Sequence, residues 1–197
     1  VNSELNKESF IDQEAIQKFV GEFNYPIYHL DFETFASAVP VFDGSRPYQQ
    51  MVFQYSLHIE HKAGQLDHRE YLAEVNGEDP RIKFIEQMIY DCGDSGDVLV
   101  YNIGFERGKL FDLIEFSPKH KVPILKIIDR LKDLMVPFRD RMYYTPSMQG
   151  SYSIKKVLPA LVPELSYKML NIQEGGTASN TFSQMVQGNF EGDAVQT

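Results

Sequence analysis

Strand-like and helix-like segments follow one another along this chain in an order that indicates a mixed sheet. Three β-rich segments come early, and Gly64, between the second and the third, supplies the turn of a hairpin. A further short apolar segment follows a predicted helix and is expected to be buried in the same sheet. The β-rich segments are residues 27–34, 51–60, 66–72 and 98–101. This order predicts an α/β domain in which antiparallel strands come first and helices pack on the faces of the sheet.

Helical spacing of apolar residues marks the other elements. The predicted helices are residues 12–22, 80–90, 105–116, 123–134 and 152–161. The segment 36–50 contains two prolines and a glycine and is expected to be an irregular loop, whereas the tail from Gly175 is weakly patterned. We interpret residues 1–24 as a lead-in helical segment and residues 25–197 as one domain of ordinary size.

Composition bounds the class of protein. Hydrophobic residues make up 43% of the 197 residues, which is ample for a buried core, and no apolar run approaches the ~20 residues that span a bilayer. The start of the chain is polar and lacks an initiating Met, so we expect a piece of a longer protein with further domains. Cys92 is the single cysteine, which excludes internal disulfides and Cys-based zinc sites. A small buried thiol in a reducing cytoplasm fits best.

The net charge of −9 argues against a protein that coats nucleic acid by electrostatics alone. The charge is uneven, however, because the segment 119–156 holds nine basic and three acidic side chains. Such a segment beside an acidic site could hold a phosphate backbone. A solvated basic helix face is an equally good interpretation.

Two acids lie near the end of the first β-rich segment. Asp31 and Glu33 are separated by one residue, so on a strand they point to the same face. Neighbouring carboxylates repel each other, and Mg²⁺ or Mn²⁺ removes the repulsion because these ions prefer carboxylate oxygens. Two solvated or salt-bridged acids at a strand end are the alternative.

A second acidic element follows the predicted strand 98–101. Gly104 lets the backbone turn from strand to helix, and Glu106 falls in the first turn of that helix. The helix dipole favours an acid at this position, which by itself accounts for Glu106. A strand-end acid pair combined with an acid at a strand-to-helix turn is a more specific indication of a functional site than either part alone.

These two elements resemble the motifs of the DEDD exonucleases, the DnaQ-like branch of the ribonuclease H-like superfamily. Asp31 and Glu33 match the first motif, D-x-E. Asn102, Phe105 and Glu106 match the second, N-x-x-F-D, with Glu in place of Asp. More widely, over residues 25–176, four segments are similar to an uncharacterised bacterial family within that group. These segments are YHLDFETF, FQYSLH, VYNIGFERGKL and GSYSIKKVLPAL.

The resemblance implies a ribonuclease H-like fold and a 3′–5′ exonuclease that hydrolyses phosphodiester bonds with two Mg²⁺ or Mn²⁺ ions. It implies that Asp31 bridges both ions, that Glu33 binds the ion that activates water, and that Glu106 binds the other. The substrate would be a single-stranded 3′ end of nucleic acid. The residues expected to contact it are Phe32, Thr34, Asn102 and Phe105.

The third motif of these enzymes, a Tyr or His followed by a metal-binding Asp, is absent from the sequence after Glu106. Tyr167, for example, has Asn171 at the spacing where an Asp is required. We therefore expect the fourth carboxylate and the general base to lie beyond Thr197. Asp129 and Asp133 are weaker substitutes on the predicted helix 123–134, where Asp133 is expected to be a solvated or capping acid.

Two other functions stay open from the sequence: a non-catalytic ribonuclease H-like module that binds nucleic acid or a protein, and a phosphodiesterase for small nucleotides. Three histidines beside the hairpin are expected at the surface rather than on zinc, namely His58, His61 and His68. Three tyrosines are expected to pack rather than stack on bases, namely Tyr143, Tyr144 and Tyr152.

Overall fold

The computed structural model describes residues 8–164 and 175–188, and a five-stranded mixed sheet lies at the centre of this part of the chain. Its strands are β2 (Ile27–Phe35), β3 (Met51–Lys62), β4 (Gln65–Leu72), β5 (Asp97–Val100) and β6 (Leu131–Asp133). The strand order is β4-β3-β2-β5-β6, antiparallel from β4 to β2 and parallel from β2 to β6. The expected mixed sheet, with an antiparallel hairpin beside parallel strands, is confirmed.

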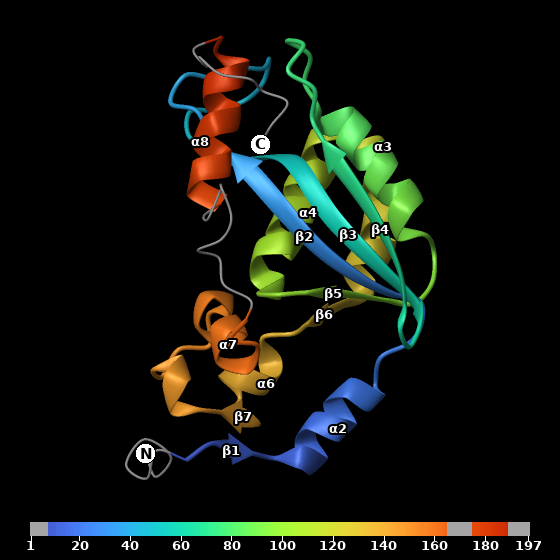
Figure 1. Cartoon of the computed structure of the whole chain (residues 1–197). Helices are drawn as coiled ribbons and strands as arrows, with labels where there is room; N and C mark the ends of the chain where they lie inside the picture. The colour runs from blue at the N-terminus through green and yellow to red at the C-terminus, as the bar shows by residue number, and fades with distance from the viewer. Residues whose placement is uncertain (1–7, 165–174, 189–197) are drawn as a thin grey trace.

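Helices lie behind this sheet and beyond its ends in the view of Figure 1. They are α2 (Gln13–Gly21), α3 (Arg81–Cys92), α4 (Ile103–Phe116), α5 (Lys121–Asp129), α6 (Val136–Arg139), α7 (Ile154–Leu161) and α8 (Gly175–Val186). Short 3₁₀ turns, η1 (Pro118–His120) and η2 (Pro146–Met148), and a two-residue pairing of β1 (Phe10–Ile11) with β7 (Tyr143–Tyr144) complete the described elements. The lead-in helix and the helices predicted at 80–90 and 105–116 are confirmed, with ends that differ by one or two residues.

One face of the sheet carries the main core. Alternate residues of β2, among them Leu30 and Phe32, point to this face and are buried against α3, α4 and α5. The ring of Phe32 meets that of Phe84 from α3 edge-on, with 5.5 Å between the ring centroids. Cys92 ends α3 in the same core, where burial raises the pKa of its thiol to about 12. The expected buried cysteine is confirmed.

The predicted helix 123–134 is wrong in its second half. Helix α5 ends at Asp129, and the next residues form β6, which pairs in parallel with β5. The backbone carbonyl of Arg130 accepts a hydrogen bond from the N–H of Val98 at 2.9 Å, which starts the pairing. The Arg130 guanidinium also donates to the carbonyl oxygen of Cys92 at 2.8 Å. These contacts across the fold override the local helical pattern.

The tail from Gly175, weakly patterned in sequence, contains helix α8. Figure 1 shows this helix beside the carboxyl end of β2. Phe182 is its buried anchor: the ring stacks on Phe53 at 4.2 Å and meets Phe35 edge-on at 5.0 Å between ring centroids. A second, smaller core therefore closes this end of the sheet.

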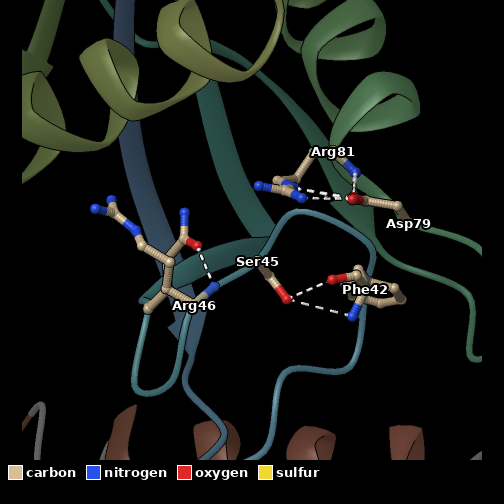
Figure 2. A network of polar contacts seen from close by, with 6 residues as sticks. Phe42, Ser45, Arg46, Asp79 and Arg81 are labelled. Carbon is tan, nitrogen blue, oxygen red and sulfur yellow. Dashed lines mark hydrogen bonds and ion pairs between the residues drawn. The ribbon is translucent and has the colours of Figure 1, made fainter.

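The irregular loop predicted at 36–50 is confirmed. Figure 2 shows the polar contacts that shape it, with the Ser45 hydroxyl donating to the Phe42 carbonyl at 2.6 Å. The same view shows Arg81, at the start of α3, paired with Asp79 at 2.6 Å. The Arg81 guanidinium also lies 3.7 Å from the ring centroid of Phe116, which joins α3 to the end of α4.

Among the described helices, none is long and apolar enough to cross a membrane.

Candidate functional site

The carboxyl ends of three parallel strands meet at one edge of the sheet. In the register of the pairing, His29 of β2 lies opposite Leu99 of β5, and Val100 of β5 lies opposite Asp133 at the end of β6. The chain leaves β5 at this edge and enters α4, which carries Glu106 in its first turn. Figure 1 shows the edge facing the side of the molecule on which α7 and α8 lie. Crevices at such edges are where open α/β sheets place their ligand sites.

Asp31 and Glu33 lie on the face of β2 opposite the main core. Their cross-strand partners on β3 are Ser56 and Gln54. Asp31 is exposed and Glu33 is half-buried. The surrounding sheet still removes enough hydration to raise the pKa of both carboxyl groups, and the Asp31 charge raises that of Glu33 further. The pair therefore has the shared face and the mutual repulsion that the sequence predicts.

Glu106 is the most perturbed acid of the edge. Its side chain is 2% exposed, and among the described residues its Oε2 has no hydrogen-bond partner. Loss of hydration raises its pKa to about 8; the backbone N–H of Glu106 opposes this shift, and the charges of Asp31 and Asp133 add to it. A buried carboxylate oxygen without a partner is costly, so the fold holds this group in a position that only a proton or a cation relieves.

The turn that presents Glu106 is built on Asn102. This residue has φ 76° and ψ 67°, the left-handed region that asparagine tolerates better than most residues. Its backbone N–H donates to Oδ1 of Asp133 at 3.0 Å, and its carbonyl accepts the N–H of Phe105 at 2.9 Å. Because the helix begins at once, Glu106 faces back toward the strand end.

Asp133 differs from its prediction. It is 9% exposed on a strand, not solvated on a helix, and its Oδ1 also accepts the N–H of Met135 at 3.0 Å. It therefore caps two backbone groups, so the capping half of the prediction is right. Sequence reasoning ranked Asp133 low because its contact with Asn102 joins two distant parts of the chain. Asp129, the other substitute acid, is exposed at the end of α5.

The residues predicted to contact substrate divide into two groups. Phe32 is 3% exposed in the main core, so its prediction as a substrate contact is wrong: on a strand, the residue between two surface acids must point inward. Phe105 packs partly against the same core. Thr34 is half-buried beside a bulge in β2, and Asn102 is exposed at the strand end. These last two lie where the edge is accessible.

The chemistry of the donors fits Mg²⁺ or Mn²⁺, because carboxylate oxygens are the ligands these ions prefer. The unpartnered Oε2 of Glu106 is the observation on this chain that speaks for such an ion. In residues 8–164 and 175–188, however, no three His, Cys, Asp or Glu side chains stand close enough together to hold one. Tyr167 and Asn171, weighed for the third motif, lie outside the described residues.

A cleft of about 640 Å³ adjoins the acidic edge, and sequence reasoning missed it. One wall is formed by the strand end and its turn, including Tyr101 and Asn102, and the other by residues 149–154. The Tyr101 hydroxyl donates to the Tyr152 carbonyl at 2.6 Å across the two walls. Sequence reasoning missed the cleft because its two walls come from segments far apart in the chain. The segment GSYSIKKVLPAL, which contains most of the second wall, was singled out only for its resemblance to a family.

The predicted basic segment 119–156 does not form one surface. Lys119 and Lys126 pair with Glu86 and Asp94, at 3.8 and 3.4 Å, beside α3. Later basic residues lie nearer the acidic edge. Arg139 approaches Oδ2 of Asp133 at 3.6 Å, and Lys156 donates to Gln149 of the cleft wall at 2.7 Å.

The other candidates have ordinary surroundings. The rings of His58 and His68 stack at 4.4 Å on the exposed side of the hairpin, and His61 pairs with Asp67 at 2.8 Å. Tyr143 and Tyr144 are half-buried in the pairing of β7 with β1.

The family model described as "Domain of unknown function (DUF2779)" matches residues 28–153. Among curated relatives, "Uncharacterized protein UU173" of Ureaplasma parvum is 30% identical over 192 residues, which cover 86% of this chain and 27% of that protein. "Uncharacterized protein MG366 homolog" of Mycoplasma pneumoniae is 30% identical over 170 residues, which cover 76% and 25%. The chain thus spans about a quarter of the length of these relatives. No solved structure gives a significant match.

Proposed function

The chain belongs to the DUF2779 family, and we propose that this domain is a metal-dependent 3′–5′ exonuclease acting on single-stranded nucleic acid in the cytoplasm. The observation that carries the proposal is Glu106. Glu106 is 2% exposed, one of its oxygens has no hydrogen-bond partner among the described residues, and the charges of Asp31 and Asp133 lie near it; a divalent cation would stabilise such a carboxylate. The resemblance of the two acidic motifs to those of DEDD exonucleases suggests the function of this cation, which is hydrolysis of phosphodiester bonds.

Two divalent cations, when bound, supply an activated water and neutralise the charge that develops on the phosphate. As the resemblance implies, Asp31 would hold both ions, with Glu33 and Glu106 each on one. Asp133 holds the backbone of Asn102, from which the helix that carries Glu106 starts. We expect the fourth carboxylate and the general base to come from residues outside 1–197.

The test is an exonuclease assay on the full-length natural protein. Single-stranded DNA and RNA, labelled at the 5′ end, are incubated with Mg²⁺ or Mn²⁺ and examined for stepwise shortening. Wild type is expected to shorten at least one substrate, and Asp31→Asn to lose this activity while keeping its melting temperature. Asp67→Asn, on the exposed hairpin, is the matched control and should stay active.

The remaining outcomes separate the alternatives. Full activity in Asp31→Asn would place the site elsewhere. Binding of oligonucleotides without shortening in either metal would favour a non-catalytic module. Hydrolysis of mononucleotide esters but not of strands would favour a small-nucleotide phosphodiesterase.

A further inference from the structure

The cleft beside the acidic edge has the size and position of a ligand site. Its volume of about 640 Å³ lies within the ~300–1,000 Å³ typical of small-molecule pockets. Asn102 belongs both to its wall and to the turn that leads to Glu106. A ligand in the cleft therefore lies against the turn from which the helix bearing Glu106 starts.

Aromatic and polar groups line this cleft together. Tyr101 is held from two sides: its ring stacks on that of Phe138, at 6.4 Å between centroids and 30° between planes, and its hydroxyl donates to the Tyr152 carbonyl. Tyr152 itself leaves 47% of its surface exposed in the opposite wall. Ser151 and Ser153 add hydroxyl groups beside it. Ring faces with hydroxyls around them suit a nucleobase and its sugar.

Positive charge adjoins the same wall. Lys155 and Lys156 follow the lining residue Ile154 directly, and the Lys156 ammonium donates to Gln149, another lining residue. Lys156 thus places an ammonium group beside the cleft wall, and Lys155 precedes it in the sequence. They provide a partner for phosphate, whereas an uncharged small molecule would have no use for them.

We propose that this cleft binds one nucleotide unit of the single-stranded substrate, with its base against Tyr152 and its phosphate toward Lys155 and Lys156. The inference rests on the proposed function, because it names the substrate contact of the same site. It goes further in assigning recognition to residues 149–156, which neither acidic motif includes. The strand would thereby be held with its phosphodiester bond at the acidic edge.

The experiment measures binding without hydrolysis. Full-length protein is titrated into a fluorescent oligothymidylate of twelve nucleotides in the presence of EDTA, and the fluorescence anisotropy gives Kd. Tyr152→Ala removes the ring but keeps the carbonyl that Tyr101 holds, and it is expected to raise Kd about tenfold, the loss of one stacked base. Tyr152→Phe should bind like wild type. Tyr90→Ala, whose tyrosine is 73% exposed on α3, is the matched control and should leave Kd unchanged.

A second variant tests the charge separately. Lys155→Gln combined with Lys156→Gln is expected to raise Kd and to make it less dependent on salt, whereas Lys83→Gln on α3 should do neither. The proposal is overturned if wild type does not bind the oligonucleotide, or if neither the Tyr152→Ala variant nor the double lysine variant weakens binding. It is also overturned if thymidine monophosphate binds as tightly as the oligonucleotide, since the ligand would then be the free nucleotide.

Failure here is distinct from failure of the proposed function. If wild type shortens the substrate in an Asp31-dependent way but the cleft variants have an unchanged Kd, the nucleotide-binding cleft is rejected and the exonuclease proposal stands. If the cleft variants bind more weakly but wild type does not shorten the substrate, the cleft proposal stands and the exonuclease proposal is rejected.

Discussion

The carboxylate of Asp133 accepts the backbone N–H of Asn102 at 3.0 Å and so ties the end of β6 to the turn that begins α4. The same oxygen accepts the N–H of Met135. One buried side chain thereby satisfies two backbone donors and fixes the left-handed residue on which the position of Glu106 depends.

Replacing Asp133 should destabilise the fold in a graded way. Asp133→Ala leaves two partly buried N–H groups without this acceptor, and we expect a loss of about 2–4 kcal/mol in the free energy of unfolding, measured by urea denaturation. Asp133→Asn keeps an acceptor oxygen and should lose about 1 kcal/mol. Asp129→Ala, at an exposed position, is the control and should stay within about 0.5 kcal/mol of wild type. Equal losses for Ala and Asn would show that the acceptor oxygen does not matter.

Glu106 should make stability fall as pH rises. Its pKa is about 8 in the folded chain against 4.5 as the ordinary value, so the folded state holds the proton more tightly than the unfolded state. The contribution of Glu106 to stability is therefore full below pH 4.5 and is lost as the pH rises to about 8, a loss on the order of a few kcal/mol. In EDTA, Glu106→Gln should flatten this decline in urea titrations between pH 5 and 8.5. An identical pH profile in wild type and variant would refute the shift.

Removing the neighbouring charge should move that transition. Asp31→Asn abolishes a repulsion that raises the pKa of Glu106 in the folded state, so the decline in stability should still begin near pH 4.5 but should end at a lower pH and be smaller than in wild type. The same titrations in EDTA measure this displacement. Asp67→Asn on the hairpin should leave it where it is. No displacement in Asp31→Asn would mean that the two carboxylates do not sense each other.

The charge of Glu106 should matter more to activity than its length. Glu106→Asp keeps the carboxylate at a helix start whose geometry can adjust, and we expect a loss in kcat of no more than about tenfold. Glu106→Gln keeps the shape but removes the charge, and the loss should reach about 100-fold. The end-labelled assay with Mn²⁺ gives both numbers. Greater activity in Gln than in Asp would contradict a metal ligand at this position.

Phe182 should anchor α8. Its ring is 4% exposed between Phe35 and Phe53, so Phe182→Ala opens a cavity and should cost about 3 kcal/mol in the free energy of unfolding. In the Phe182→Ala variant, hydrogen exchange should be faster for the amides of α8 than for those of α3. Val39→Ala, at a position 70% exposed, provides the comparison and should have no measurable effect. A Phe182→Ala variant as stable as wild type would mean that α8 is not held by this contact.

Elements whose burial follows a local period could be predicted from sequence, and elements made by distant contacts could not. The alternation in β2 and the helical spacing in α3 are written in adjacent residues. Strand β6 has three residues, too few to show a period, and exists because β5 pairs with it. In α8 a usable signal was present, since Ala178, Phe182 and Val186 recur every four residues and pack into one cluster.

The candidate site divides in the same way. The side-by-side placement of Asp31 and Glu33 follows from the period of a strand, and Glu106 came from its resemblance to a motif. The role of Asp133 depends on a hydrogen bond between β6 and the turn after β5, and the cleft depends on residues 149–154 approaching that turn. Neither relation is visible in a local window of sequence.

The spread of the acids along the chain also bears on when the site comes into being during folding. Asp31 lies on β2, Glu106 in the first turn of α4 and Asp133 at the end of β6, so these acids share one edge only once β5 has paired with β2 and β6 with β5. Contacts between segments far apart in the chain form late, because the chain entropy lost in closing a long loop must be overcome before the contact itself contributes free energy. A nascent or partly folded chain therefore lacks the acidic edge. This edge is a property of the finished sheet.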